Sequence, residues 1–161
     1  MSYKLEAFIL NHTAAEMLPD KLRHLHRFRL NDRLALVPVT RQLYKEVVAT
    51  FGEARDDPYD DTLFMRLHPA LSQMAIKISS VAPVLYLEVD VASGIGDRTA
   101  IVWHTGEAAY GPSEGSSHVT EAFRVFRQIE GLSLDQTGEL NIFRYRFTED
   151  WVQDIENDSD E

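Results

Sequence analysis

The chain has 161 residues, of which 44% are hydrophobic and 26% charged, a balance typical of a globular domain with its own core. It contains no cysteine, which excludes a disulfide scaffold, a thiolate metal site and a cysteine nucleophile. The start MSYKLEAFIL lacks the regions of a signal peptide, and no apolar run approaches about 18 residues, so we expect a cytoplasmic protein without a membrane span.

The net charge of −10 is unevenly distributed along the chain. Between residues 21 and 45 the basic residues outweigh the single acidic residue Asp32, and they are Lys21, Arg23, Arg27, Arg29, Arg33, Arg41 and Lys45. From position 149 onward every charged residue is acidic: Glu149, Asp150, Asp154, Glu156, Asp158, Asp160 and Glu161. This balance repels nucleic acid and attracts a basic partner.

In chain order, residues 3–10 are expected to form a strand that is apolar on both faces. Thr13 and Glu16 have the spacing of a capping box, which predicts a helix with Thr13 as its N-cap. That helix either stops before Pro19, or Pro19 opens a second helical segment that continues to Leu25.

Residues 28–39 are expected to form a second strand, and Pro38 places it at the edge of the sheet or near the strand's end. Thr40 is a good N-cap for a helix that Gly52 closes. After the polar segment 53–61, residues 62–80 are expected to be helical in large part, with one apolar face formed by Leu71, Met74, Ala75 and Ile78.

The runs VLYLEVDV (84–91) and TAIVWH (99–104) predict two strands that pair antiparallel across the bend at 94–96, and Thr105-Gly106 predicts a hairpin turn. The stretch SSHVTEAFRVFRQIEG predicts an amphipathic helix that ends near Gly131, and its apolar stripe is Val119, Ala122, Phe123, Phe126 and Ile129. Alternation in NIFRYRF (141–147) predicts a half-buried strand. Trp151, Val152 and Ile155 are expected to dock one last turn.

Three strand regions follow one another without an intervening helix, and such strands pair antiparallel. The sequence therefore predicts an α+β fold with a mixed, largely antiparallel sheet and three to four helices. We expect one domain over residues 1–153, because no repeat or linker interrupts it. The charge composition of residues 154–161 predicts a disordered acidic tail that adds nothing to the stability of the fold.

The glycines of VASGIGDR (91–98) suggest a phosphate-binding loop, but such a loop needs a helix N-terminus after it. A second strand follows here instead, and the lysine and third glycine of the two common phosphate motifs are missing. We therefore interpret the stretch as a turn between strands. A helix that started between Gly96 and Thr99 would contradict this interpretation.

Four carboxylates lie close together at Asp56, Asp57, Asp60 and Asp61. They could hold a hard cation such as Ca²⁺, but the glycine and glutamate positions of an EF-hand loop are absent. We expect them to be solvated, and we assign these four aspartates and Trp103 to partner binding.

Other candidate residues favour structural roles. His24 and His26 lie two apart among cations, which disfavours a metal ion, and Ser116 and Ser117 are expected to cap a helix. The sequence therefore identifies no catalytic, cofactor-binding or metal-binding residue.

Three stretches together resemble a family of small, largely uncharacterised bacterial proteins: DRLALVPVTRQLY (32–44), APVLYLEVDVASGIGDRTAIVWHTGEAAYGP (82–112) and the amphipathic helix that follows. In that family a strand with an acidic end runs into a glycine-rich bend, and a second strand ending in Trp, a glycine turn and a Gly-Pro follow. The resemblance implies an immunity-protein-like role and supplies no catalytic residue. Residues 91–93 depart from the family, whose members are richer in aromatic residues and glycine there.

From charge and resemblance we expect a small acidic binding protein, an immunity or antitoxin-like factor that occludes a basic partner protein. Two alternatives stay open: a metal-dependent hydrolase that uses the aspartates of residues 56–61, and a regulatory small-molecule binder. Nucleic acid is a disfavoured partner, and self-association remains an open alternative.

Overall fold

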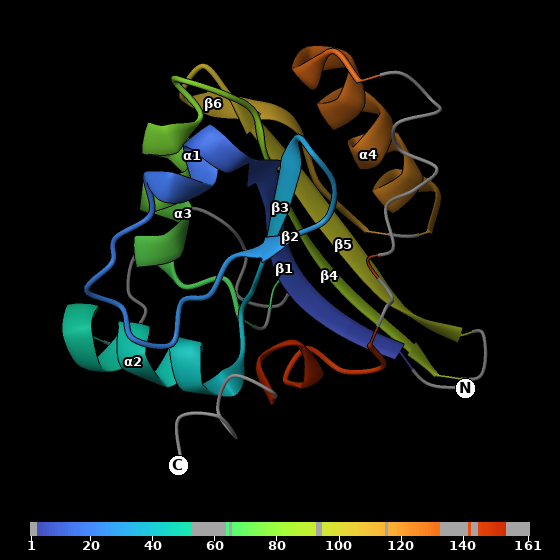
Figure 1. Cartoon of the computed structure of the whole chain (residues 1–161). Coiled ribbons are helices and arrows are strands. Elements are labelled where there is room, and N and C mark those ends of the chain that lie inside the picture. The colour runs from blue at the N-terminus through green and yellow to red at the C-terminus, as the bar shows by residue number, and fades with distance from the viewer. Residues whose placement is uncertain are drawn as a thin grey trace.

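The computed structural model describes residues 3–52, 64, 66–92, 95–114, 116–132, 142 and 145–153. Its elements in chain order are β1 (Tyr3–Asn11), α1 (His12–Glu16), β2 (Phe28–Arg29), β3 (Leu34–Pro38), α2 (Arg41–Phe51), α3 (Pro69–Ile78), β4 (Val84–Ala92), β5 (Ile95–His104), β6 (Glu107–Glu114) and α4 (Ser116–Glu130). The strands form one six-stranded sheet in the order β2-β3-β1-β4-β5-β6, and every pairing among them is antiparallel. The α+β prediction is confirmed (Figure 1).

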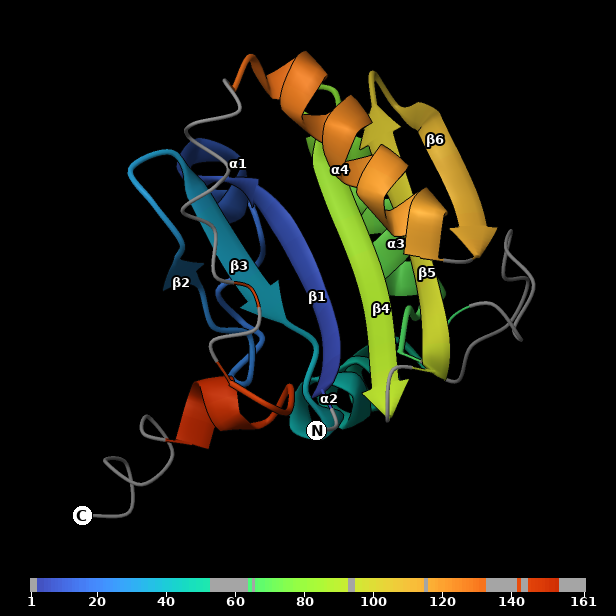
Figure 2. The ribbon, with the colours of Figure 1, turned by 90° about the vertical axis from the view of Figure 1, so that its right-hand side faces the viewer.

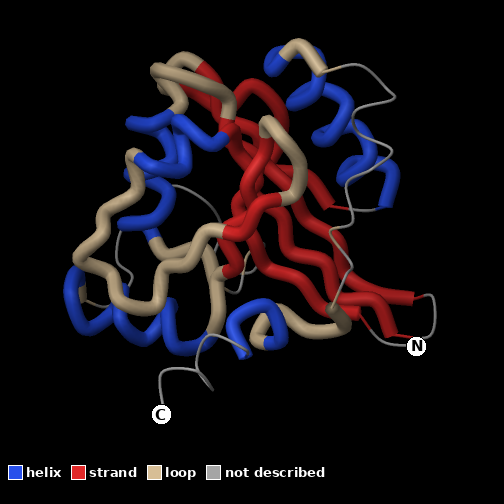
Figure 3. Tube along the Cα trace, viewed as in Figure 1, coloured by secondary structure: helices blue, strands red, loops and turns tan. Residues whose placement is uncertain are grey.

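Helices cover the two faces of the sheet, with α1, α2 and α3 on one side and α4 on the other (Figures 1 and 3). Side chains alternate along the strands, so Phe8 and Leu10 of β1 face α1–α3, whereas Leu5, Ala7 and Ile9 face α4. On this second side Phe126 of α4 is fully buried, and α4 crosses β4 and β5 (Figure 2). The central strand β1 therefore buries apolar side chains on both faces, as its sequence predicts.

The antiparallel hairpin of β4 and β5 is confirmed, because Val84 pairs with Trp103 and Val91 pairs with Gly96. A strand and not a helix follows the glycines, which removes the structural basis for the phosphate-binding interpretation. The turn from β5 to β6 is also confirmed, and its residues Thr105 and Gly106 both have positive φ, at 55° and 82°. Such angles are typical of a two-residue hairpin turn, and glycine accepts them without strain.

The expected starts of two helices are wrong. Asn11 caps α1, because β1 runs directly into the helix and the Asn11 side chain accepts the Ala14 N–H at 2.7 Å. Helix α1 ends at Glu16, and residues 17–27 form turns and coil, so no second helical segment reaches Leu25. The described part of 62–80 becomes helical only at Pro69, where His68 accepts the Ala70 N–H at 2.9 Å.

The predicted strand over 141–147 is wrong where the structure describes it, since Tyr145–Phe147 form a bend. One backbone bond joins Lys4 N–H to Arg146 C=O at 2.7 Å, and the side chain of Thr148 then accepts the Glu6 N–H at 3.1 Å. The Thr148 hydroxyl thus takes the place of the backbone carbonyl that would accept the next hydrogen bond of a strand ladder. This segment lies beside the first half of β1, which β3 does not reach.

Residues 150–153 form the expected last helical turn, with Trp151 and Val152 buried. Ile155 and the acidic tail lie outside the described residues, so the expectations for them stay predictions. The described helices include none that is long and apolar enough to cross a bilayer.

Thr40 tests how much a helix cap stabilises this fold. Its buried hydroxyl accepts the Leu43 N–H at 3.1 Å at the start of α2. We expect Thr40→Ala to lower the free energy of unfolding by about 1 kcal/mol, measured by urea denaturation. Thr50→Ala, at an exposed position of the same helix, is the control and should change it by less than about 0.5 kcal/mol. Equal losses for both variants would contradict the capping role.

Candidate functional site

A row of polar residues crosses the sheet on the face that α2 and α3 cover. Glu6 of β1 pairs with Glu88 of β4, and Glu88 pairs with Thr99 of β5. All three are buried, at 3%, 8% and 5% exposure. Paired residues on neighbouring strands point to the same face, so the register alone places two carboxylates side by side in the interior. Such an arrangement is unstable unless cations and hydrogen-bond donors compensate the charge.

Arg66 supplies the compensating charge from the segment before α3. Its Nη1 lies 3.3 Å from Glu6 Oε2, 2.7 Å from Glu149 Oε1 and 3.0 Å from the carbonyl oxygen of Val39. Its backbone N–H donates to Glu88 Oε2 at 2.8 Å. One residue therefore contacts both buried carboxylates and the C-terminal segment.

Two hydroxyls complete the network around these carboxylates. Tyr86, fully buried, donates to Glu88 Oε2 at 2.6 Å, and Thr148 donates to Glu6 Oε2. On the outer side Lys4 Nζ lies 3.6 Å from Glu6 Oε1. We call the residues Glu6, Arg66, Tyr86, Glu88, Thr148 and Glu149 the Arg66 network.

The environment raises the pKa of two groups in the network and lowers the pKa of a third. Burial raises the pKa of Glu6 above its ordinary value, and the nearby Glu88 adds to this, although Thr148, Arg66 and Lys4 oppose it. Burial likewise raises the pKa of Tyr86, so that its hydroxyl keeps its proton and donates. For Glu149 burial is outweighed by the hydrogen bond and the charge of Arg66, which lower its pKa.

The network joins residues that lie next to the two acidic segments of the chain. Arg66 lies a few residues after the aspartates of 56–61, and Glu149 lies just before the tail that starts at Asp154. Glu149 also accepts the backbone N–H of Arg41 at the start of α2, at 3.2 Å. The network therefore fixes where the acidic segments join the folded body.

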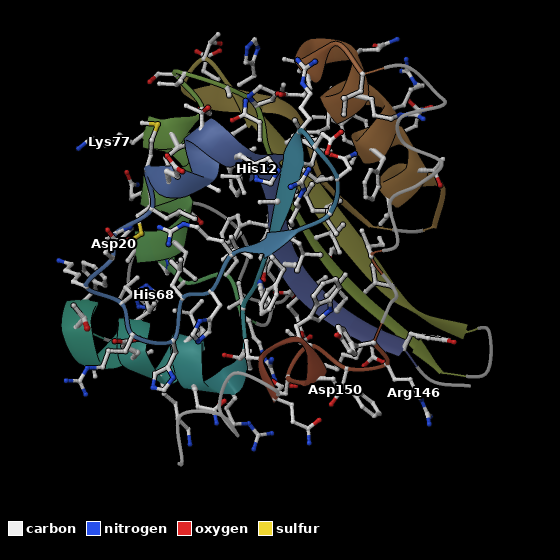
Figure 4. The ribbon with its side chains drawn as sticks, in the orientation of Figure 1. His12, Asp20, His68, Lys77, Arg146 and Asp150 are labelled. Carbon is white, nitrogen blue, oxygen red and sulfur yellow. The ribbon has the colours of Figure 1, made fainter. Side chains whose placement is uncertain are left out.

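A cavity of about 380 Å³ lies at the opposite end of β1, near His12 (Figure 4). Charged side chains line it, and both of its arginines already contact a carboxylate or the backbone. Arg27 donates to the carbonyls of Ala15 and Leu18 at 2.6 and 2.7 Å, and Arg29 pairs with Asp32. We therefore base no function on this cavity.

Of the residues that the sequence assigns to partner binding, the structure describes only Trp103. Asp56, Asp57, Asp60 and Asp61 lie outside the described residues. Trp103 is 0% exposed and stacks on Phe8 with ring centroids 6.4 Å apart. A side chain without exposed surface cannot contact a partner, so the expectation for Trp103 is corrected: it is a core residue.

Sequence reasoning missed the Arg66 network, although part of the signal is present. Glu6 has the same two-residue spacing as Phe8 and Leu10, and Glu88 continues the series of Val84 and Tyr86. This period of two places both glutamates on buried faces. Arg66 and Glu149 carry no comparable pattern.

No group of three or more His, Asp or Glu side chains in the described part of the chain is arranged to hold a metal ion. Comparison with known proteins adds no relative, because no family model, curated protein or solved structure matches the chain.

Arg66→Met tests the compensation of charge in the network. The variant keeps the aliphatic stem but leaves Glu6 and Glu88 buried without the guanidinium, so we expect the free energy of unfolding at neutral pH to fall by about 3 kcal/mol. The control Arg29→Met removes an exposed pair with Asp32 and should cost less than about 1 kcal/mol. Similar losses for the two variants, measured by urea denaturation, would contradict the role of Arg66.

The raised pKa of Glu6 predicts how stability depends on pH. The unfolded chain releases this proton near the ordinary value of 4.5, whereas the folded chain keeps it to a higher pH. The contribution of Glu6 is therefore fully present below 4.5 and is lost as the pH rises through the pKa of the folded state. Measured against Glu6→Gln across this range, the stability of the native chain should fall as the pH rises. If the stability of the native chain relative to Glu6→Gln instead rises with pH, Arg66 and Lys4 outweigh burial in their effect on the pKa of Glu6.

Proposed function

We propose that the chain is a small acidic binding protein of the cytoplasm, an immunity- or antitoxin-like factor that occludes a basic partner protein. The observation that carries the proposal is the separation of charge. Acidic and basic residues are equal in number among the described residues, so the net charge of −10 belongs to the remaining segments, chiefly 53–61 and 154–161. A neutral body that carries two acidic segments is suited to a cationic surface.

The Arg66 network supports this proposal because it anchors the ends of both segments. Arg66 Nη1 and Glu149 Oε1 lie 2.7 Å apart, so the two segments connect to one region of the body. In the proposed mechanism, binding is stoichiometric. The acidic side chains accelerate the encounter with the partner, and the bound acidic segments cover the partner's basic surface.

An aromatic anchor would supply affinity once the charges have met. In this proposal Phe51 takes the place that the sequence assigns to Trp103, because it is 41% exposed and lies two residues before the acidic segment 53–61. Lys21 lies over its ring at 5.1 Å, so an arriving partner would compete with this lysine for the aromatic face.

The test starts with affinity capture from the native cell under nuclease treatment, followed by binding measurements with the purified partner. We expect one basic protein in a defined stoichiometry. Changing Asp56, Asp57, Asp60 and Asp61 to Asn should slow association at low salt by on the order of tenfold, because fewer charges attract the partner. Phe51→Ala should mainly speed dissociation.

The control changes four exposed carboxylates of the body to amides: Glu16, Asp20, Asp90 and Glu107. It removes the same charge from a different surface and should leave association within about twofold of the native rate. Capture that depends on nucleic acid would contradict the proposal, as would equal effects of the two sets of changes.

A further inference from the structure

Four exposed cations follow the outer side of α2 and the loop beside it. Arg41 and Lys45 lie one turn apart on the helix, and the backbone N–H of Arg23 donates to Glu46 at 2.7 Å. Lys21 lies over Phe51 at the end of the same helix. We call Lys21, Arg23, Arg41 and Lys45 the cationic strip.

The strip differs from the other basic residues of this region in its pairing. Arg27, Arg29 and Arg33 each pair with a carboxylate, whereas no described carboxylate pairs with a side chain of the strip. Two acidic residues adjoin the strip in sequence: Asp20 pairs with Arg27, and the two oxygens of Glu46 accept the backbone N–H groups of Arg23 and His24 at 2.7 and 2.8 Å. The four cationic side chains thus form no ion pair with a described carboxylate, although Asp20 and Glu46 adjoin them in sequence.

The acidic tail of the same chain starts beside one end of this strip. Glu149 accepts the Arg41 N–H, and the helical turn over 150–153 leads from it to the tail (Figure 2). The eight residues 154–161 reach about 26 Å when extended, whereas the eleven residues of α2 span about 16 Å. All charged residues of the tail are acidic: Asp154, Glu156, Asp158, Asp160 and Glu161.

We propose that residues 154–161 bind the cationic strip of their own molecule. The tether keeps the tail at an effective concentration that another acidic ligand would have to match. A nucleic acid would in addition be repelled by the tail itself, so the structure favours the intramolecular ligand. This contact does not depend on the proposed function. If the proposed function also holds, a basic partner must displace the cationic strip from the tail before the partner binds the tail.

Thermal stability is a poor readout for this contact. Ion pairs between exposed side chains contribute little to the free energy of unfolding. Docking would therefore replace the expected disorder of residues 154–161 but is compatible with the expectation that they add nothing to stability. The decisive measurement is the position of the tail.

The absence of cysteine permits such a measurement, because Ser159→Cys creates a unique site for a spin label in the full-length chain. We expect the label to broaden amide resonances of α2 and of residues 21–24 more than those of α3 and α4. At about 1 M salt, where the Debye length falls to about 3 Å, this selective broadening should disappear. Broadening that is uniform over the surface, absent, or insensitive to salt would overturn the proposal.

Two variants and one mixing experiment complete the test. Lys45→Glu reverses one of four cations and halves the net charge of the strip, so the broadening at α2 should fall by a comparable factor. Lys77→Glu makes the same change on α3, away from α2, and should leave it unaltered (Figure 4). Chain that carries the spin label but no ¹⁵N is then mixed with ¹⁵N-labelled chain that lacks the spin label. Broadening at α2 in this mixture that equals the intramolecular effect would assign the tail to a second copy and overturn the proposal.

Discussion

The arrangement of this molecule depends on two glutamates that the sheet register forces together. Glu6 and Glu88 are direct neighbours on β1 and β4, on a face whose other buried strand residues, apart from Thr99, are apolar. Their burial is tolerable because Arg66 and two hydroxyls contact the carboxylates. In return, the compensation ties the residues before α3 and the residues after position 145 to the two central strands.

An apolar pair at the same two positions would fill the interior with less loss of solvation. The charged arrangement adds direction, because Arg66 must reach Glu6, Glu149 and the Val39 carbonyl at once. It thereby specifies how the start of α2 and the C-terminal segment meet at this end of the sheet. Apolar contacts, which have no preferred direction, specify such positions less strictly.

Sequence patterns predicted the parts of the fold that local periodicity controls. The hairpin of β4 and β5, the helix from Arg41 to Phe51 and the stripe of α4 follow from spacing and caps within the element itself. One error arises where a distant group replaces a local one, and another where a different local residue caps the helix. The alternation of 141–147 resembles a strand, but Thr148 uses its side chain on Glu6 and the ladder ends. Asn11 caps α1 because β1 leads straight into it, which no capping box indicates.

The candidate site was less predictable than the fold for the same reason. A glutamate in an apolar strand can be assigned to a buried face from its spacing, but its counter-charge can come from any position in the chain. Arg66 and Glu149 lie 60 and 83 residues from their respective partners Glu6 and Arg66. The residues proposed to bind a partner depend instead on charge and on exposure. Charge can be read directly from the sequence, but exposure cannot: Trp103 is buried and Phe51 is exposed.

The bond between Glu6 and Thr148, separated by 142 positions, has a consequence for synthesis of the chain. Among the described strands β1 is made before the others, yet one side of β1 is completed by β4 and the other by β3 together with residues 146–148. The central strand β1 therefore keeps unsatisfied backbone groups until residues 146–148 have left the ribosome. Contacts of such long sequence separation are slow to form. Of the described strands, the one made earliest is completed last, and its protection during translation depends on whatever covers the nascent chain.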